Sequence, residues 1–278
     1  MIDFEKYILQ KKQRIDSELE KIIDSAKSSF LYESMKYALF PGGKRFRALL
    51  ALCSGESFGA SEDKLLPYAC ALELIHNYSL IHDDLPSMDN DDFRRGKLTV
   101  HKVFGEAIAL LAGDALLTLS FQVLSSLKDP FAIRIINEIS KAAGIDGMIN
   151  GQAMDLQLNQ EVLNEKDFLD LSLKKTACLI TASVKTGGIV AQAEEDKITA
   201  LENYGRNLGI AYQIIDDILD IQQEKSINRV NYAILIGKEE AEKKAHEFKE
   251  KAVSALRNAD IKSECLEYLA DKAVKRKN

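Results

Sequence analysis

Two groups of aspartate residues carry the chemistry that this sequence most clearly suggests. The first group reads DDLPSMDNDD over 83–92, and the second reads DDILD over 216–220. Each follows a long apolar segment, so its carboxylates would crowd together near the end of a buried helix, where they repel each other and lose hydration. A divalent cation between them would relieve this repulsion. Hard oxygen ligands suit Mg²⁺, which commonly binds one or two carboxylates together with substrate phosphates.

In the second group, helical periodicity brings two carboxylates to one face. Asp216 and Asp220 are four positions apart, which places them about 40° from each other around a helix. Asp217 lies beside them. The sequence therefore predicts an acidic cluster on one face of a helix.

The first group requires a break in its helix. Asp83 and Asp89 are six positions apart, about 120° out of phase on a regular helix, and Asp84 lies between them in sequence. Pro86 and the polar residues after it predict that the helix ends here, so that a loop can return Asp89 to Asp83. One such group alone could be a solvated helix end, but two groups after buried helices favour cation binding.

Two short basic segments could supply a local positive field, namely GGKRFR at 42–47 and RRGK at 94–97. The rigid fork of an arginine matches two phosphate oxygens at once. The alternative for these residues is an ordinary solvated surface. The formal net charge of −6 argues against a general nucleic-acid binder, but it does not exclude anionic substrates.

Long helices must position these groups. Only four prolines occur, the last of them Pro130, and apolar residues recur at three- and four-residue spacing. We expect buried central helices over 65–84 and 201–221. Further helices are expected at about 3–26, 45–58, 102–126, 131–157, 166–186, 238–257 and 261–275. Alternating β patterns are nearly absent, so the prediction is a single all-α domain spanning 1–278, with no linker and no repeat of fixed period.

The composition indicates a protein that can bury a large core, since 46% of its residues are hydrophobic. Met1 leads directly into a charged segment, so we expect no signal peptide, and we expect no apolar run of the roughly 18 residues that predict a membrane span. The cysteines are scattered without a CxxC pair, which favours unpaired core residues of a reduced, cytoplasmic protein. They are Cys53, Cys70, Cys178 and Cys265.

These motifs make the sequence resemble the trans-isoprenyl diphosphate synthase (polyprenyl synthetase) family, and within it the bacterial farnesyl diphosphate synthases. The resemblance covers most of the chain. Its anchors are GGKRFR (42–47), LIHDDLPSMDNDDFRRGKLTVHKVFGEA (80–107), GDALL (113–117), GQAMDL (151–156), KT (175–176) and YQIIDDILD (212–220). It implies a helical bundle around a central cavity, the isoprenoid synthase fold, and a homodimer without stable membrane insertion.

The resemblance also implies roles for the matching residues. Two or three Mg²⁺ ions would be held by Asp83, Asp89 and Asp216, with acidic shells completed by Asp84, Asp217 and Asp220. The allylic diphosphate would contact Arg94 and Lys175. The isopentenyl diphosphate would be bound by Lys44, Arg47, His76 and Arg95. The developing carbocation would face the backbone carbonyls of Lys175 and Thr176 and the side-chain oxygen of Gln213.

The implied reaction joins isopentenyl diphosphate to dimethylallyl or geranyl diphosphate by ionisation, condensation and elimination, that is, dimethylallyltranstransferase and geranyltranstransferase activity. Charge that develops on the departing diphosphate is stabilised by Mg²⁺ and by Arg and Lys side chains. A closed site protects the carbocation from water. We expect His82 to be a structural residue rather than a base.

Product length is expected to depend on Tyr78, with Ser79 beside it. Tyr78 lies five residues before Asp83, about 7.5 Å along a helix axis. In the resembled family an aromatic ring near this position limits the growing chain, which predicts a C15 product. The alternative is a tyrosine that only packs in the core.

The sequence departs from the family pattern after Asp220. The resembled family continues with a GKxTYP-like segment, with which we align NRVNYA (228–233), and Arg229 then stands where the family has a lysine that contacts diphosphate. About eleven residues are missing from this loop. Either the natural protein has a shortened loop or a segment is missing from the sequence, and the intact mass compared with 31.0 kDa would distinguish the two.

Four other functions compete with this interpretation. A geranylgeranyl or geranyl diphosphate synthase would share the same motifs. A terpene cyclase would normally carry an NDxxSxxxE motif, which we do not find, and an HD-type phosphohydrolase would need more metal-binding histidines than the four present. A non-catalytic prenyltransferase subunit would commonly have lost an aspartate motif, whereas both are intact here.

Overall fold

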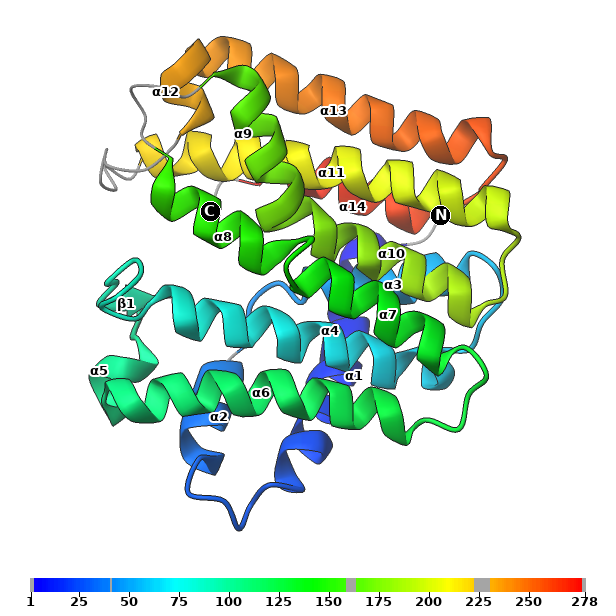
Figure 1. Ribbon diagram of the computed structural model, residues 1–278. Coiled ribbons are helices and arrows are strands. Elements are labelled where there is room, and N and C mark those ends of the chain that lie inside the picture. Colours follow the sequence, from blue (N-terminus) through cyan, green and yellow to red (C-terminus); the bar gives the residue numbers. More distant parts are fainter. Residues whose placement is uncertain (1–2, 41, 159–163, 223–230, 277–278) are drawn as a thin grey trace. The chain divides into compact units, whose positions relative to one another are not determined.

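The computed structural model describes residues 3–40, 42–158, 164–222 and 231–276, and helices dominate this part of the chain (Figure 1). The chain divides into two compact units. Unit 1 comprises residues 1–52 and 61–136, and unit 2 comprises residues 53–60 and 137–278. The single domain expected from the sequence stays a prediction.

Unit 1 is built around α4, whose side chains are buried on nearly every face, and α4 packs against α6. Its elements are α1 (Phe4–Asp24), α2 (Tyr32–Leu39), the first part of α3 (Phe46–Glu56), α4 (Glu62–Asp83), β1 (Phe93–Arg94), β2 (Lys97–Leu98), α5 (Val100–Phe104), α6 (Glu106–Ser126) and the start of α7 (Ala132–Ala143). The two short strands form an antiparallel hairpin. Its turn residues Arg95 and Gly96 both have positive φ, as a two-residue type I′ turn requires.

Unit 2 is built around α11, which packs against α10, α13 and α14 (Figure 1). Its elements are the rest of α3 and α7, α8 (Met148–Gln157), α9 (Glu165–Ser172), the π-helical turn η2 (Leu173–Ala177), α10 (Cys178–Val190), α11 (Glu195–Gln222), α12 (Tyr232–Ile236), α13 (Lys238–Asn258) and α14 (Glu264–Lys275). Buried Tyr204 on α11 donates a hydrogen bond of 2.7 Å to the carbonyl of Leu266 on α14.

Most of the predicted helices are present, with three differences. The helix expected over 131–157 is two helices, α7 and α8, because residues 144–147, from Gly144 to Gly147, are not helical. The helix expected over 166–186 passes through the π-helical turn η2. The short helices α2, α5 and α12 were not expected as separate helices, because eight, five and five residues are too few to show a clear period.

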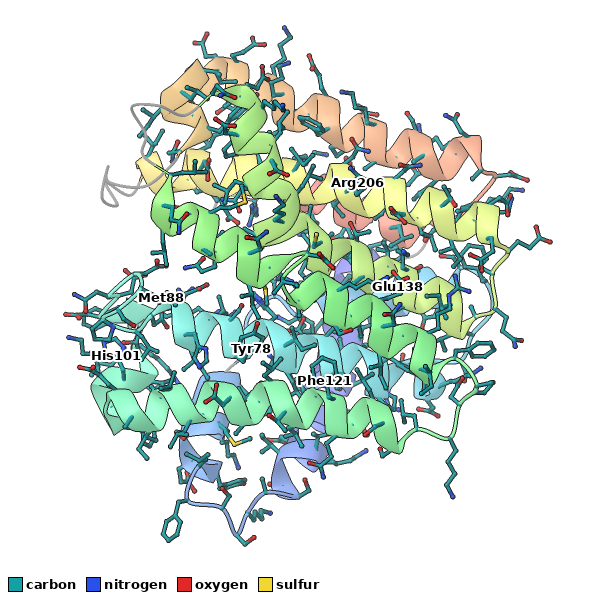
Figure 2. The ribbon with its side chains drawn as sticks, in the orientation of Figure 1. Tyr78, Met88, His101, Phe121, Glu138 and Arg206 are labelled. Carbon is teal, nitrogen blue, oxygen red and sulfur yellow. A yellow bond between two sulfur atoms is a disulfide. The ribbon has the colours of Figure 1, made fainter. Side chains whose placement is uncertain are left out.

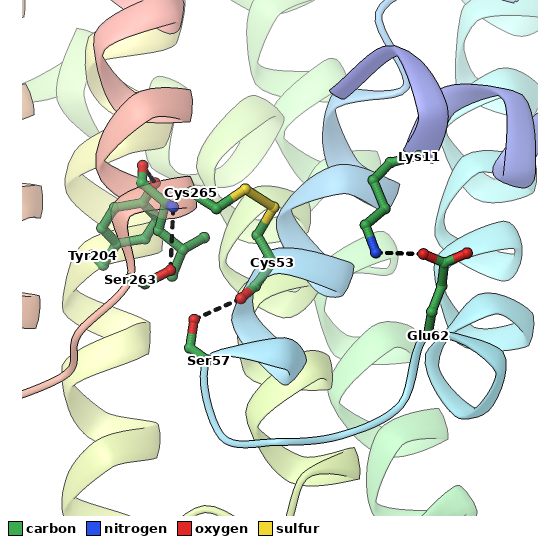
Figure 3. The surroundings of a disulfide bond; sticks show 8 residues. Lys11, Cys53, Ser57, Glu62, Tyr204, Ser263 and Cys265 are labelled. Atoms are coloured by element: carbon green, nitrogen blue, oxygen red, sulfur yellow. Dashed lines mark hydrogen bonds and ion pairs between the residues drawn. A yellow bond between two sulfur atoms is a disulfide. The ribbon is translucent and has the colours of Figure 1, made fainter. Parts of the chain in front are cut away.

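The expectation that all four cysteines are unpaired is wrong. Cys53, near the end of α3, and Cys265, near the start of α14, form a disulfide bond with their Cα atoms 5.8 Å apart (Figure 3). They are 212 positions apart in sequence, so no local spacing could reveal the pairing. Cys70 and Cys178 are free thiols.

Helix α6 contradicts the expectation that no apolar run could span a membrane. By length and composition alone, Glu106–Ser126 is apolar enough to do so, with a mean hydropathy of 1.8 over an 18-residue window. Only 33% of that window is buried. Leu110 and Leu111 are about half exposed. Part of the apolar surface of α6 is therefore exposed in the described part of the chain.

Candidate active site

The first aspartate group lies where α4 ends. The backbone N–H of Asp89 donates a hydrogen bond of 2.8 Å to the carbonyl of Asp83, the last residue of α4. The chain therefore turns back after the helix and places Asp89 beside Asp83, as Pro86 and the polar run predicted. Both aspartates are partly exposed.

Asp84, which is expected to complete an acidic shell, is buried against Arg94. It is only 3% exposed, and both of its carboxylate oxygens accept hydrogen bonds from Arg94 at 2.7 and 2.9 Å. Burial raises the pKa of Asp84, whereas the bonds from Arg94 lower it. Asp84 therefore acts first as an anchor for Arg94, which leads into the hairpin turn.

The predicted isopentenyl diphosphate residues gather around His76 on α4. Burial lowers the pKa of His76 well below its ordinary value, and the nearby guanidinium groups of Arg47, Arg95 and Arg94 lower it further. The Arg95 guanidinium lies against Gly43, where an added Cβ would be 2.5 Å from its Cζ atom. Arg45 also lowers the pKa of His76, so four arginine cations and a neutral imidazole share one region of unit 1. Lys44, from the same GGKRFR segment, is exposed.

Arg45 is a residue whose importance we did not predict. Its side chain is fully buried, donates hydrogen bonds to Asp16 at 2.7 Å and to the Leu39 carbonyl at 2.8 Å, and lies over the Phe40 ring. Its φ of +52° is unusual for a non-glycine residue. Arg45 therefore fixes the GGKRFR segment from within.

Tyr78, the predicted chain-length residue, is buried on α4 (Figure 2). Burial raises its pKa to about 12, so the phenol stays neutral. Its ring meets the ring of His82 edge to face, with centroids 5.7 Å apart. His82 also lies 3.0 Å from the carbonyl of Leu110, which supports a structural role. The hydroxyl of Ser79 donates a hydrogen bond of 2.9 Å to the carbonyl of His76.

The second aspartate group lies near the C-terminal end of α11. Asp216 and Asp220 are partly exposed, in keeping with their predicted common face. Asp216 Oδ1 lies 2.7 Å from the guanidinium of Arg276, which itself stacks 3.5 Å over the ring of Tyr212. The pairing of Arg276 with Asp216 could not be predicted, because the two residues lie far apart in sequence.

Asp217, which is also expected to complete an acidic shell, is buried. It is 3% exposed. One oxygen accepts a hydrogen bond from the side-chain amide of Gln213 at 2.9 Å, and the other accepts one from the backbone N–H of Tyr232 at 2.7 Å. Burial raises the pKa of Asp217 to about 8, the two hydrogen bonds lower it, and the carboxylates of Asp216 and Asp220 raise it.

Lys175 and Thr176 occupy the π-helical turn η2. Such turns leave a local irregularity in the backbone hydrogen bonding and are frequent at functional sites. The hydroxyl of Thr176 donates a hydrogen bond of 2.6 Å to Oε1 of Gln213. The structure thus places three residues predicted to face the carbocation side by side.

Two glycines hold this turn by close backbone contact. An added Cβ at Gly151 on α8 would lie 2.3 Å from the backbone nitrogen of Lys175, and one at Gly209 on α11 would lie 2.3 Å from the Cα of Ala177. Lys175 also pairs with Asp155 of α8 at 2.5 Å. Asp155 was not assigned a role from the sequence, although its GQAMDL motif was recognised.

Each acidic group, taken by itself, offers carboxylates of the kind that bind Mg²⁺ when substrate completes the coordination. In the described ranges, no three His, Cys, Asp or Glu side chains already converge to hold an ion. Mg²⁺ needs only one or two carboxylates when phosphate oxygens and waters supply the remaining ligands. Asp83 and Asp89 in unit 1 are partly exposed and can provide such ligands, and so is Asp216 in unit 2. Arg229 and most of the loop after Asp220 lie outside the described residues.

Comparisons with known proteins point to one family. The sequence profile of the polyprenyl synthetase family matches residues 28–232. The chain is 38% identical to the farnesyl diphosphate synthase of Geobacillus stearothermophilus, over 97% of each chain. It is 37% identical to the large subunit 1 of the heterodimeric geranylgeranyl pyrophosphate synthase of Arabidopsis thaliana, over 97% of this chain and 76% of that one. A geranyltransferase from Helicobacter pylori, solved in complex with magnesium and isoprenyl diphosphate, superposes with a TM-score of 0.83 at 28% identity, covering 99% of this chain and 97% of the other.

Proposed function

This chain belongs to the polyprenyl synthetase family, and we propose that it condenses isopentenyl diphosphate with dimethylallyl or geranyl diphosphate to form farnesyl diphosphate. It has the isoprenoid synthase fold and is a trans-prenyltransferase that elongates an isoprenoid chain. The relatives include both farnesyl and geranylgeranyl diphosphate synthases. The C15 product is therefore the specific part of the proposal.

The buried ring of Tyr78 is the observation that supports a C15 product. It lies five residues before Asp83 on α4, which is about 7.5 Å along the helix axis. A fixed aromatic ring at this depth would stop a growing chain that extends down the helix from the diphosphate. A smaller side chain would let the product lengthen.

The residues that bind substrate divide by charge. Asp83, Asp89 and Asp216 would hold Mg²⁺, which when bound stabilises the charge that grows on the departing diphosphate. Arg94 and Lys175 would donate hydrogen bonds to that diphosphate, and the guanidinium of Arg94 is already oriented by Asp84.

The second substrate needs cations but no ionisation. We assign Lys44, Arg47 and Arg95, with neutral His76, to isopentenyl diphosphate, because these cations can bind a diphosphate, and the C–O bond of this substrate is not allylic and would not ionise to a stabilised cation. The carbonyl oxygens of Lys175 and Thr176 and the oxygen of Gln213 would stabilise the carbocation electrostatically. The released diphosphate would then accept the proton that leaves when the new double bond forms.

Product sizing tests this function directly. Purified protein is incubated with Mg²⁺, isopentenyl diphosphate and either dimethylallyl or geranyl diphosphate, and the products are separated by chain length. We expect farnesyl diphosphate from the wild type, longer products from Tyr78→Ala, and almost no product from Asp83→Ala. Tyr68→Ala is the matched control, because Tyr68 is buried on the same helix ten positions earlier, and its product should remain C15. A wild-type C20 product would instead identify a geranylgeranyl diphosphate synthase, and an inactive wild type would favour a non-catalytic subunit.

We also propose that the protein is a homodimer whose interface includes the exposed apolar side chains of α6. Leu110 and Leu111 are 47% and 49% exposed on a helix that is otherwise apolar. A second copy of this chain would remove this surface from water. Light scattering after size-exclusion chromatography should give about twice 31.0 kDa, and Leu111→Asp should reduce the mass to that of a monomer. Sedimentation with lipid vesicles would point to a membrane surface instead.

We place the protein in the cytoplasm. The substrates that the family implies are charged diphosphates, which do not cross membranes unaided. Cell fractionation tests this location. Alkylation of thiols immediately after lysis then shows whether Cys53 and Cys265 are bonded in the cell.

A further inference from the structure

The first turn of α3 depends on another helix for its cap. The carbonyl of Arg45 accepts the first hydrogen bond of α3, from the backbone N–H of Leu49 at 2.9 Å, so Arg45 is the N-cap residue. A capping side chain must accept hydrogen bonds from the N–H groups of the first turn, whereas a guanidinium can only donate them. The acceptor for this turn must therefore come from elsewhere in the chain.

Glu73 on α4 supplies that acceptor. Its Oε1 accepts a hydrogen bond of 3.2 Å from the backbone N–H of Ala48, and its Oε2 lies 3.7 Å from Nη1 of Arg45. Glu73 is only 2% exposed, so solvent does not compete for these contacts. The Arg45 guanidinium is held in turn by Asp16 on α1 and by the carbonyl of Leu39. One carboxyl group thus joins the N-cap and the first turn of α3 to α4, and all of these residues lie in unit 1.

The same contact lies next to two of the residues assigned to isopentenyl diphosphate. Arg47 directly precedes Ala48 in the first turn of α3, and His76 follows Glu73 by three positions, about one helical turn along α4. Arg47 is only 8% exposed, and after burial its guanidinium is the group that lowers the pKa of His76 most. The position of Arg47 beside His76 therefore depends on how the start of α3 is held against α4.

We propose that Glu73 is a positioning residue for the second substrate: its carboxyl group holds the first turn of α3 against α4 and so keeps Arg47 beside His76. This inference rests on the proposed function, in which both of these residues bind isopentenyl diphosphate. Glu73 itself need not touch the substrate. Without its carboxyl group, the N–H of Ala48 would be buried without an acceptor, and the turn that carries Arg47 would shift to satisfy it.

Glu73→Met removes the acceptor and keeps a side chain of similar length, because a thioether is only a weak acceptor. We expect the KM for isopentenyl diphosphate to rise by about tenfold, since a displacement of about 1 Å at a binding group is costly. The KM for geranyl diphosphate and kcat at saturating isopentenyl diphosphate should stay within about twofold of the wild-type values, because the binding of one substrate alone is weakened. Isothermal titration calorimetry with isopentenyl diphosphate and Mg²⁺ should show the same loss of affinity without turnover.

Other substitutions on α4 provide the matched comparisons. Glu73→Gln keeps an oxygen that can accept from the Ala48 N–H, so its KM for isopentenyl diphosphate should stay within about threefold of the wild-type value. Leu65→Ala removes a buried side chain about two turns earlier, so it should lower the melting temperature and leave that KM unchanged. If Glu73→Met does not fold, Glu73→Asp takes its place: the carboxyl group is withdrawn by one methylene, and the KM for isopentenyl diphosphate should rise by at least about threefold.

The imidazole NMR signals of His76 report the positioning without any reaction. They are assigned among the four histidines by their loss in His76→Asn. They should shift in Glu73→Met and return toward the wild-type values in Glu73→Gln. Both variants remove the same carboxyl group, so a difference between them reflects the position of the neighbouring turn.

These outcomes separate the inference from the proposed function. A wild type that is inactive, or that does not bind isopentenyl diphosphate, would refute the proposed function, while the His76 signals would still report whether Glu73 holds its surroundings. The inference is overturned if Glu73→Met, or Glu73→Asp in its place, leaves the KM for isopentenyl diphosphate unchanged or lowers kcat to the same degree. It is also overturned if Glu73→Gln is no better than Glu73→Met, or if Leu65→Ala raises that KM equally.

Discussion

Gly209→Ala tests whether close backbone packing positions the π-helical turn. Gly209 is on α11 at the point where this helix meets Ala177, the last residue of η2. The methyl group of the variant would lie 2.3 Å from both the Cα and the Cβ of Ala177, whereas ordinary contact begins near 3.4 Å. The helices must therefore separate by about 1 Å, and the turn that carries Lys175 and Thr176 must move with them.

The size of the effect follows from this overlap. In an unconstrained helix, replacing glycine by alanine stabilises by up to about 1 kcal/mol. Overpacking of a close contact costs about 1–3 kcal/mol, so here the sign should reverse. A chain of this size loses roughly 2–4 °C of melting temperature per kcal/mol, which predicts a fall of several degrees. A displacement of about 1 Å at reacting groups can cost up to about a hundredfold in rate, so kcat should fall by about ten- to a hundredfold.

Gly188→Ala separates position from stability. Gly188 is buried on α10, but its added methyl group would meet only the ends of the flexible Leu201 and Ile198 side chains, at 2.6 and 2.8 Å. We expect a change in melting temperature with kcat within about twofold of wild type. Differential scanning fluorimetry and steady-state kinetics with geranyl diphosphate measure both quantities. If Gly209→Ala keeps wild-type kcat and melting temperature, the close contact does not position the turn and the reasoning is wrong.

Three further predictions concern stability. Asp84→Asn should lower the free energy of unfolding by about 1–3 kcal/mol in urea titrations, because Arg94 loses its carboxylate. This lies between the contribution of an exposed pair, about 0–1 kcal/mol, and the cost of removing one partner of a buried pair, about 3–5 kcal/mol, since the Arg94 side chain is 32% exposed. An unchanged midpoint would contradict the anchoring role. The pKa of His76 is lower in the folded than in the unfolded protein, so its contribution to stability is present above pH 6.5 and is lost as the pH falls below that value. His76→Asn should flatten the dependence of the free energy of unfolding on pH. Identical profiles of stability against pH for the variant and the wild type would argue against a neutral buried imidazole. Cys53→Ser should lower the free energy of unfolding by about 2–4 kcal/mol under oxidising conditions, because it removes the disulfide bond. Wild-type protein treated with a reductant should unfold like the variant. Equal stability of the two proteins without reductant would show that the disulfide does not stabilise the fold.

The features that could be predicted from the sequence are those that local apolar periodicity determines. The long helices α4 and α11 and the acidic groups near their ends follow from apolar spacing and from the break at Pro86. The return of Asp89 to Asp83 could be predicted because a helix end and a short polar run leave few alternatives. The GGKRFR segment was recognised as basic. Which of its cations would be buried could not be predicted, since Arg45 depends on Asp16, 29 positions earlier.

The features that could not be predicted depend on contacts between distant segments. The disulfide joins residues 212 positions apart, and the ion pair of Asp155 with Lys175 joins α8 to the π-helical turn. The π-helical turn itself has no compositional signature in LKKTA. Its position depends on Gly151 and Gly209, which in sequence look like ordinary helical glycines.

The adjacent aspartates at 83–84 and 216–217 show how one motif encodes two functions. In each pair the first carboxylate is partly exposed, whereas the second is 3% exposed. A helix turns about 100° per residue, so two adjacent carboxylates cannot both face the same ion, and the second must find partners inside the protein. Asp84 holds Arg94, and Asp217 holds Gln213. If the proposed function is right, each pair would couple a magnesium ligand to the orientation of a side chain that meets the substrate. Replacing the first aspartate of either pair by asparagine should mainly raise the magnesium requirement, and replacing the second should mainly lower kcat or stability.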